Sequence, residues 1–596
     1  MGTARRPPTR SDPPLRTLLR LLTFLRPYKW SVAVTAFSAL ALMACTITLP
    51  YLTRRVIDDV LNGQQEDALL PLVLIVVVVG VIRAIFAVMR RILAGHVSLG
   101  VEFDLRDRVF AHLQQLSFGY FDRMPVGQLM SRATSDLQTV RFFLGYGLIF
   151  LFMHAFTLVF ITVVLLLINV PLTVLALLMG PALVLVAARA SKRSHPVLVD
   201  VQQKVADVTQ MAEESIAGIR VVKAFGQETA QDERFGARAE QAFSRSMDAA
   251  RLQSFYQGLM GFLPVLGISV VIAAGGVMTI NGALTLGEFV QFYLYLAILT
   301  FPFRSIGNLI GSAQRAAASG QRVFEILDTE PQLAQPTHPV PLPPGGGHVQ
   351  LEGVTFGYEP GSPVLRDLQL DIPAGRTVAL IGPTGSGKST ITQLIPRFYD
   401  PQAGRVLLDG VDVRDVRLED IRGAVGMVTQ DPFLFSDTVR ANIAFGQPDA
   451  SDDDIARAAR MAQADTFIRA LPEGYDTVVG ERGFTLSGGQ RQRIAIARAI
   501  LVDPRVLVLD EATASVDAST EREISRALAT VMTGRTTIII AHRLSTISLA
   551  DEIVLIDDGH VAARGEHDTL YATSALYRDI HDQGLARPDE LVARDA

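Results

Sequence analysis

Six long apolar stretches limit what this chain can fold into more than any other feature. They lie at about residues 31–52, 68–90, 142–168, 171–190, 256–280 and 286–312. Each contains roughly the twenty apolar residues that a helix needs to cross a bilayer. The sequence therefore predicts a multi-pass membrane protein whose first half is an all-α domain of six transmembrane helices.

The composition changes along the chain. Hydrophobic residues make up 49% and charged residues 19% of the 596 residues, whereas soluble chains carry roughly 25% charged residues. The apolar runs end near residue 312, and the chain after Gly345 has the pattern of a soluble α/β protein. The net charge of −5 argues against a nucleic-acid partner, which would require a basic surface.

Lysine and arginine predict which side of the membrane each loop faces, because cytoplasmic loops are enriched in them. They are frequent before residue 30 and in the segments 92–141 and 190–255. The turn at 281–285 has none, and Arg54 and Arg55 are outweighed by nearby acidic residues. We therefore expect both termini in the cytoplasm. We also expect the spans to lie in the inner (plasma) membrane of a bacterial cell.

The sequence "RTVALIGPTGSGKST" has the pattern of a short apolar strand, a glycine-rich turn and a helix start. In such phosphate loops the backbone N–H groups surround phosphates, the lysine contacts the terminal phosphates, and the hydroxyl after it ligates Mg²⁺. We expect Ser389 to be this Mg²⁺ ligand. The residues expected to bind ATP are Gly382, Pro383, Thr384, Gly385, Ser386, Gly387, Lys388, Ser389 and Thr390.

The sequence "VLVLDE" ends a second apolar strand in two acidic residues, Asp510 and Glu511. At the carboxyl end of a parallel strand, Asp510 would hold Mg²⁺ through water and Glu511 would act as the general base on the attacking water. Alone, the pattern fits a strand followed by a helix cap equally well. The phosphate loop upstream favours the catalytic interpretation.

Three further polar residues are candidates for the same site. Gln430 follows the strand in "MVTQDPFLF" and is expected to contact Mg²⁺ or the attacking water. His542 ends the strand in "IIIAHR" and is a candidate γ-phosphate contact, although by itself it also fits a surface histidine. Tyr358 precedes the phosphate loop and is a candidate for stacking on adenine, with an exposed turn tyrosine as the alternative.

The composition and the motifs divide the chain into five predicted regions. Residues 1–30 form a cytoplasmic N-terminus with an interfacial helix, 31–325 the six-helix transmembrane domain, 326–348 a linker, 349–585 the α/β nucleotide-binding domain and 586–596 a tail. The two long inner loops of the membrane domain keep helical periodicity. We therefore expect the spans to extend into the cytoplasm and to turn within residues 119–136 and 214–228.

The segment "LSGGQRQR", Leu486 to Arg493, is a second glycine-rich helix start. One nucleotide needs only one phosphate loop, so this segment requires another explanation. Together with the motifs above it resembles an ATP-binding cassette (ABC) protein. In that resemblance Tyr358, Gly382–Ser389, Gln430, Leu486–Gln490, Asp510–Glu511, Ser515–Asp517 and His542 match the A-loop, Walker A, Q-loop, signature, Walker B, D-loop and H-loop.

Six spans ahead of one cassette resemble a half-size exporter of the multidrug and lipid-flippase kind, over about residues 15–580. The resemblance implies a dimer in which two cassettes meet head to tail. Ser487, Gly488, Gly489, Gln490 and Asp517 of one chain would then complete the ATP site of the other. It further implies ATP-driven export of a lipophilic or amphipathic substrate (a drug or lipid) by alternating access, with the turn helices near Tyr120 and residues 219–225 transmitting movement.

Two alternatives remain open at this stage. The D-loop sequence from Ser515 to Asp517 is similar to that of catalytic subunits of heterodimers, so the second half-transporter is either a second copy or a different chain. An importer built on the exporter-type fold, such as a siderophore uptake system, is the other alternative. A non-transporting ATPase is disfavoured because Glu511 and the signature are intact.

The spans themselves say less about the substrate. Arg83 lies about fifteen residues from the outer end of its span, so it either faces a cavity or snorkels to the inner surface. Phe289, Phe292 and Tyr293 share one helical face, and packing against helices or lipid is favoured over substrate contact. Pro302 is expected to kink its helix.

Overall fold

The computed structural model describes residues 13–480, 483, 485–511, 518–541 and 543–582. The chain divides into two compact units: unit 1 comprises residues 1–114 and 126–329, and unit 2 comprises residues 115–125 and 330–596. Asp517 and His542 lie outside the described residues, and so does the expected D-loop.

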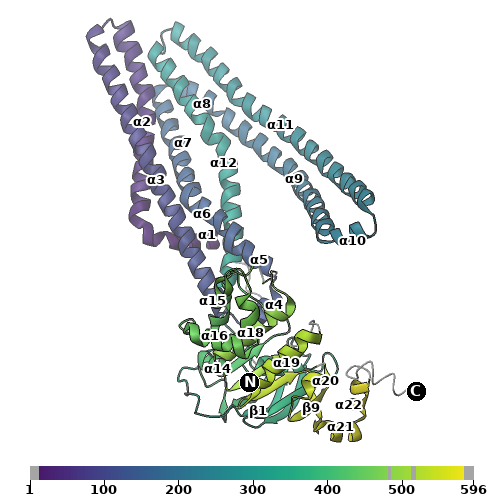
Figure 1. The fold of residues 1–596 in the computed structure, drawn as a ribbon. Coiled ribbons are helices and arrows are strands. Elements are labelled where there is room, and N and C mark those ends of the chain that lie inside the picture. The colour runs from purple at the N-terminus through teal and green to yellow at the C-terminus, as the bar shows by residue number, and fades with distance from the viewer. Residues whose placement is uncertain (1–12, 481–482, 484, 512–517, 542, 583–596) are drawn as a thin grey trace. The chain divides into compact units, whose positions relative to one another are not determined.

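Unit 1 is built from helices (Figure 1). They are α1 (Pro14–Leu22), α2 (Lys29–Arg55), α3 (Leu69–Gln115), α5 (Val126–Ser131), α6 (Leu137–Phe142), α7 (Leu148–Ile168), α8 (Val170–Leu177), α9 (Met179–Ala217), α10 (Ile219–Ala224), α11 (Glu228–Ile280) and α12 (Leu286–Leu327). Short 3-10 or π segments occur at Thr23–Tyr28, Val56–Asn62, Glu66–Ala68, Arg132–Asp136 and Phe143–Gly147.

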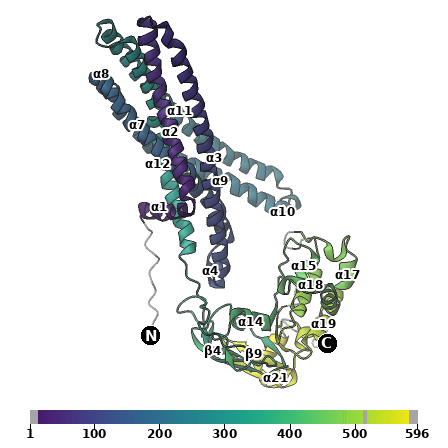
Figure 2. The same ribbon diagram turned by 90° about the vertical axis from the view of Figure 1, so that its left-hand side faces the viewer.

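In the part of the chain that the structure describes, six helical segments are long and apolar enough to cross a membrane, which confirms the six predicted spans. They are Pro14–Asn62, Glu66–Gln115, Val126–Ile168, Val170–Ala217, Glu228–Ile280 and Leu286–Leu327. Several run well past their apolar stretch. The helices α9 and α11 pack along each other and are joined by the short helix α10 (Figures 1 and 2), which places a turn within the range predicted for the second long loop.

Local sequence explains where some of these helices begin and break. The Asn169 side chain accepts a hydrogen bond from the Leu172 N–H at 3.0 Å and caps α8 after the hairpin. We expected one continuous span over 171–190, but the structure ends α8 at Leu177 and starts α9 at Met179. Pro181 follows this break, and a proline removes one backbone donor from a helix. Pro302 lies inside α12.

A hydrophobic core of unit 1 lies between α2, α7, α8, α11 and α12. Phe292 is fully buried in it, and Phe289 lies so close to Gly275 that an added Cβ there would be 2.8 Å from its ring. Both contacts agree with the packing interpretation of these aromatic residues. The Arg83 guanidinium turns toward α2, where its Nε donates to Thr46 Oγ1 at 3.2 Å.

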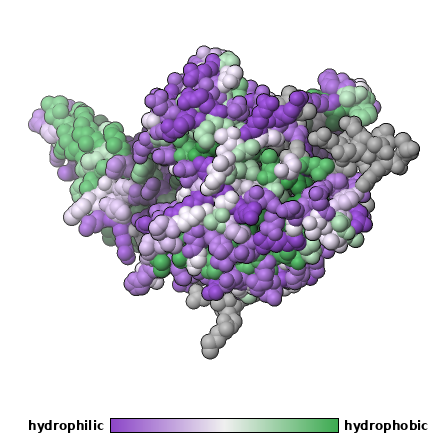
Figure 3. Space-filling view, turned by 60° about the horizontal axis from the view of Figure 1, so that its bottom comes forward, coloured by the Kyte–Doolittle hydropathy of each residue, from purple (hydrophilic) through white to green (hydrophobic). Residues whose placement is uncertain are grey.

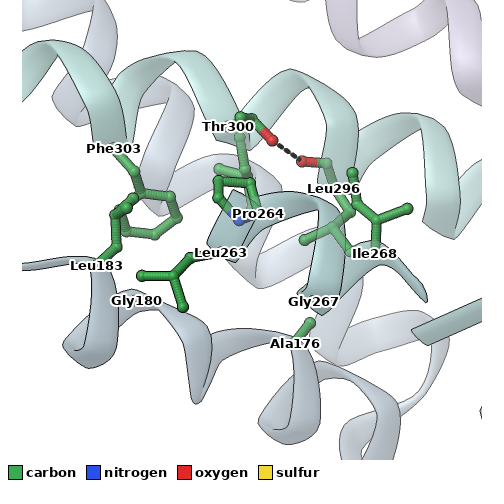
Figure 4. Close-up of a pocket in the computed structure, with 11 residues that line it drawn as sticks. Ala176, Gly180, Leu183, Leu263, Pro264, Gly267, Ile268, Leu296, Thr300 and Phe303 are labelled. Carbon is green, nitrogen blue, oxygen red and sulfur yellow. Dashed lines mark hydrogen bonds between the residues drawn. The ribbon is translucent and has the colours of Figure 1, made fainter. Parts of the chain in front are cut away.

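A small apolar cavity of about 40 Å³ lies between α8, α9, α11 and α12 (Figure 4). Its lining includes Gly180, Pro264, Thr300 and Phe303. The Thr300 hydroxyl donates to the Leu296 carbonyl at 3.3 Å, so the hydroxyl is used within its own helix. The cavity therefore has an almost wholly apolar wall.

Unit 2 is an α/β domain together with one short helix from the first half of the chain, α4 (Phe118–Arg123). Its strands are β1 (Val349–Phe356), β2 (Leu365–Ile372), β3 (Thr377–Ile381), β4 (Ala403–Leu408), β5 (Val411–Asp412), β6 (Val425–Val428), β7 (Val506–Asp510), β8 (Thr536–Ile540), β9 (Glu552–Asp557) and β10 (His560–Gly565). Its other helices are α13 (Lys388–Leu394), α14 (Leu418–Ala424), α15 (Val439–Ile443), α16 (Asp452–Met461), α17 (Asp465–Arg469), α18 (Gly488–Leu501), α19 (Ala518–Met532), α20 (Leu544–Ile547), α21 (His567–Thr573) and α22 (Ala575–Ile580).

The strands in the described part of unit 2 form two sheets. One is a four-stranded antiparallel sheet in the order β2-β1-β4-β5, and the other is a six-stranded sheet in the order β10-β9-β3-β8-β7-β6. In the larger sheet the strands from β9 to β6 are parallel, and only β10 is antiparallel.

Alternate residues of the central strands enter two hydrophobic cores, one on each face of the six-stranded sheet. Leu507 and Leu509 of β7 belong to one core, and Val506 and Val508 belong to the other. Burial on both faces explains why these strands have continuous apolar sequences. The outer face of unit 2 that comes forward in Figure 3 is mainly hydrophilic.

Candidate functional site

Within the described residues, the strand order brings three polar segments to one edge of the six-stranded sheet. The parallel strands β3, β8, β7 and β6 are neighbours in that order. The phosphate loop follows β3, Asp510 ends β7, and Gln430 lies two residues after β6. Ligands of open parallel sheets bind beyond the carboxyl ends of the strands, so this edge is the candidate nucleotide site.

Close backbone packing shapes the phosphate loop. A Cβ at Gly382 would lie 2.0 Å from the Ile556 carbonyl oxygen, so only glycine fits there. Gly387 caps α13 with a φ of 106° in the left-handed region, which glycine adopts without a steric penalty. Ser386 Oγ is buried and makes no hydrogen bond within the described residues. A buried hydroxyl of this kind suits an anionic ligand in the loop.

The Lys388 side chain is buried and donates to the carbonyls of Gly382 and Pro383, at 2.8 Å each. Burial lowers the pKa of Lys388, and the negative charges of Glu511 and Asp510 act in the opposite direction. The lysine therefore lies within electrostatic reach of both acidic residues, although more than a hundred residues separate them in the sequence. Such a cation suits the phosphates of a nucleotide.

Glu511 is held in an unusual backbone conformation. Its φ is 48°, and its N–H donates to the Ile540 carbonyl at 3.2 Å. A left-handed residue other than glycine costs about 1–3 kcal/mol and persists where the surrounding structure imposes it. Gln430 Nε2 donates to Glu511 Oε2 at 2.7 Å. Two residues that the sequence suggested separately are thus in direct contact.

Tyr358 lies beside the helix that follows the phosphate loop. Its hydroxyl donates to Gln393 Oε1 at 2.7 Å and lies 3.2 Å from Thr390 Oγ1. Burial of the hydroxyl end raises the tyrosine pKa, while the residue as a whole remains 48% exposed. Tyr358 therefore presents an exposed ring next to the loop, as stacking on a base requires.

The second glycine-rich segment begins the long helix α18. Ser487 Oγ accepts from the Gln490 N–H at 3.3 Å, and Gln490 Oε1 accepts from the Ser487 N–H at 2.8 Å. This capping box fixes the helix start. The Ser487 side chain is exposed, Gly489 is buried and Gly488 is half-buried. α18 also contacts the loop that carries Gln430, because Gln492 Nε2 donates to the Thr429 carbonyl at 3.4 Å.

Two residues near this site were not singled out from the sequence. Tyr399 packs edge-on against Tyr358, with ring centroids 5.4 Å apart, and its hydroxyl donates to Asp122 of α4. The separation of 277 residues between Tyr399 and Asp122 leaves no local pattern that links them. The only sequence signal was the expectation that the turn helix near Tyr120 transmits movement.

Known proteins resemble the chain over both halves. The family model described as the ABC transporter transmembrane region matches residues 32–303, and the one described as ABC transporter matches residues 365–514. An ATP-dependent lipid A-core flippase of Syntrophus aciditrophicus is 36% identical over 562 residues, which cover 94% of this chain and 93% of the flippase. The chain belongs to the ABC transporter family.

Two other relatives extend this assignment. A multidrug efflux ATP-binding/permease protein of Mycobacterium tuberculosis is 36% identical over 576 residues, which cover 97% of this transporter and 48% of that protein. A solved bacterial Atm1-family ABC exporter with ATP bound matches with a TM-score of 0.77 and 30% identity, over 95% of this chain and 99% of that chain.

The family and the fold settle the general character of the protein. It is a multi-pass membrane protein in which six membrane helices precede an α/β ATPase domain on the same chain. It is an ATP-hydrolysing transporter with the fold of an exporter. The half-size architecture also implies dimerisation within a lipid membrane.

Proposed function

We propose that this transporter uses ATP to export a lipophilic or amphipathic substrate, a drug or a lipid, by alternating access as a dimer. The observation that supports this proposal is that a chain with six spans carries a phosphate loop and the Glu511 carboxylate, which Gln430 holds. Both lie in unit 2. The names of the flippase and efflux relatives support this substrate class. The expected domain boundaries, with a membrane domain at 31–325 and a nucleotide-binding domain at 349–585, fit this division of labour.

Each residue at this edge of the six-stranded sheet has a separate role in ATP hydrolysis. The loop from Gly382 to Thr390 would hold the phosphates and Tyr358 the adenine. Glu511 accepts the proton of the attacking water, while Gln430 fixes the direction of its carboxylate. Mg²⁺ would be held by Ser389, Gln430 and Asp510, where it would neutralise phosphate charge. His542 remains the proposed γ-phosphate contact.

Each ATP site would be completed by a second half-transporter. The start of α18 has an exposed Ser487, and a helix N-terminus favours an anion through its N–H groups and its dipole. Ser487, Gly488, Gly489, Gln490 and Asp517 of one chain would therefore contact the nucleotide of the other. The intact Glu511 and signature allow a second copy of this chain to form two competent sites.

The topology that suits this mechanism places the ATPase domain and both termini in the cytoplasm of a bacterial cell, with the spans in the inner membrane. The clusters of lysine and arginine in the inner loops support this orientation. ATP is then available to the cassette from the cytoplasm. Accessibility of single cysteines at Asn62 and Arg123 to an impermeant reagent, in intact cells, measures the orientation.

The dimer can be tested by cross-linking. Thr384 and Ser487 both have exposed side chains, so cysteines at these positions in a Cys45→Ser background should join two chains only when nucleotide is bound and turnover is blocked. A chain that never cross-links there under saturating ATP contradicts the shared site. If purified chain hydrolyses ATP only with a second polypeptide, the partner is a different half-transporter.

Transport direction needs its own measurement. In inverted vesicles an exporter accumulates a lipophilic fluorescent probe when ATP is added outside, because the ATPase domain then faces the bath. ATP-dependent loss of the probe from preloaded inverted vesicles would instead favour the importer alternative.

A further inference from the structure

The helix α4 is anchored to unit 2 by two consecutive residues of one loop. Phe118 of α4 stacks on Phe398 with ring centroids 4.4 Å apart and an interplanar angle of 25°. The next residue, Tyr399, donates its hydroxyl proton to the Asp122 carboxylate. One end of α4 is thus held by ring stacking and the other by a charge-assisted hydrogen bond.

The loop that carries these two aromatic residues is rigid. Arg397, immediately before them, has a φ of 52° and a side chain that is only 3% exposed. Its guanidinium bonds to Asp400 at 2.8 Å and to the Ala334 carbonyl at 3.1 Å. The Phe398 N–H donates to the Gln393 carbonyl at 3.0 Å at the end of α13. Tyr399 therefore has a fixed position relative to the helix that begins at the phosphate loop.

The other side of Tyr399 belongs to an aromatic cluster that contains the base-stacking candidate. Tyr399 packs against Tyr358 at 5.4 Å and 89°, and against Phe356 at 5.4 Å and 52°. Phe356 and Tyr358 are themselves 5.1 Å apart at 84°. Edge-to-face contacts of this kind are attractive and restrict the orientation of each ring. Two contacts thus hold Tyr358: its hydroxyl bonds to Gln393 of α13, and its ring packs edge-to-face with the ring of Tyr399.

The charge of Asp122 affects the pKa of both Tyr399 and Tyr358. Burial and the bond to Asp122 both raise the pKa of Tyr399. The charge of Asp122 also contributes to the raised pKa of Tyr358, after burial of that hydroxyl. A carboxylate on α4 therefore acts on both tyrosines.

We propose that Tyr399 is a positioning residue that links the base-stacking ring of Tyr358 to α4 through Asp122, so that base binding and the position of α4 depend on each other. This inference rests on the proposed role of Tyr358 in holding adenine. Because coupling between two sites is reciprocal, the link should affect both ATP binding and the position of α4.

The first test separates the base from the phosphates. Tyr399→Phe and Asp122→Leu each remove the hydrogen bond and keep a side chain of similar size. Either change should raise the KM for ATP about three- to tenfold without changing the KI of inorganic tripolyphosphate, which has no base. The double variant should be no weaker than either single variant, because both remove the same link.

A matched control is available within unit 2. Tyr475 donates to Asp465 at 2.6 Å and resembles Tyr399 in having a pKa raised by burial and by its aspartate. Tyr475→Phe should leave both constants unchanged. A rise in both the KM for ATP and the KI of tripolyphosphate in Tyr399→Phe would show general damage to the loop and overturn the proposal, and so would an unchanged KM for ATP.

The second test measures the link at α4. Arg123, at the end of α4, is exposed, so a single cysteine there in a Cys45→Ser, Glu511→Gln chain can be labelled with a maleimide. ATP should change the labelling rate by about twofold or more relative to tripolyphosphate, and Tyr399→Phe should abolish that difference. A difference that survives in Tyr399→Phe contradicts the link. A parent chain that binds no ATP would instead contradict the proposed function itself.

Discussion

Gln430 Nε2 and Glu511 Oε2 are joined by a 2.7 Å hydrogen bond across 81 residues of sequence. The donor lies in the loop after β6 and the acceptor follows β7, the neighbouring parallel strand. The bond fixes the direction of the Glu511 carboxylate. Because α18 contacts the same loop through Thr429, the position of Glu511 is also tied to the helix that Ser487 caps.

Replacement of the candidate base should separate binding from turnover. Glu511→Gln keeps the size and the contact with Gln430 but removes the proton acceptor, so kcat should fall at least about 100-fold while the affinity for ATP stays within about threefold. Steady-state hydrolysis and equilibrium ATP binding measure the two effects. Glu552→Gln, which breaks an exposed ion pair with Arg564, should change neither. Undiminished hydrolysis in Glu511→Gln would remove Glu511 from its role.

A carboxylate at position 430 should repel Glu511. Gln430→Glu replaces the amide donor with a like charge, whereas Gln430→Ala only removes the hydrogen bond. The repulsion should turn the Glu511 carboxylate away from the attacking water, so kcat should fall at least about threefold further in Gln430→Glu than in Gln430→Ala. Steady-state hydrolysis by the two variants measures this difference. Equal kcat values would contradict contact between these side chains during turnover.

Nucleotide binding should depend on the protonation of Lys388. Burial lowers its pKa, so the ammonium is lost at lower pH than from an exposed lysine. The charged form attracts phosphate, so the affinity for ATP should be greatest below that pKa and should weaken as pH rises through it. Bound phosphate shifts the transition upward. Lys388→Ala should bind ATP at least about tenfold more weakly and should lose this pH dependence, both measurable as Kd for a fluorescent ATP analogue.

Two serine caps in unit 2 allow the structural and functional roles of Ser487 to be separated. Ser487 caps α18, and Ser451 caps α16 by accepting from the Asp454 N–H at 3.2 Å. Loss of either cap should lower the free energy of unfolding by about 1 kcal/mol. Only Ser487→Ala should also reduce ATP hydrolysis, by about tenfold or more. Equal activity of Ser487→Ala and Ser451→Ala would reduce Ser487 to a structural cap.

The sequence predicted the parts of this protein that depend on local chemistry. About twenty consecutive apolar residues are enough to specify a spanning helix, so all six spans could be recognised. The loop around Lys388 could be recognised because glycines at Gly382 and Gly387 meet steric needs within a few residues. The break between α8 and α9 was missed because an apolar run does not reveal where a helix ends within it.

The positions of Gln430 and Glu511 at strand ends were also readable in the sequence, but their mutual contact was not. It depends on β6 lying next to β7 in the sheet, and many strand orders are compatible with the same strand sequences. Tyr399 and Asp122 are an extreme case, because no periodicity or motif relates residues so far apart.

The sequence alone thus determined that the chain spans the membrane six times and carries a phosphate loop, since both features arise from residues adjacent in the chain. Only the tertiary structure decided that Glu511 is held by Gln430 and that α4 packs with the ATPase unit. The physical reason is that these contacts are selected by the packing of whole strands and helices. The interaction energy that fixes them is spread over two cores and is not encoded at the contacting residues themselves.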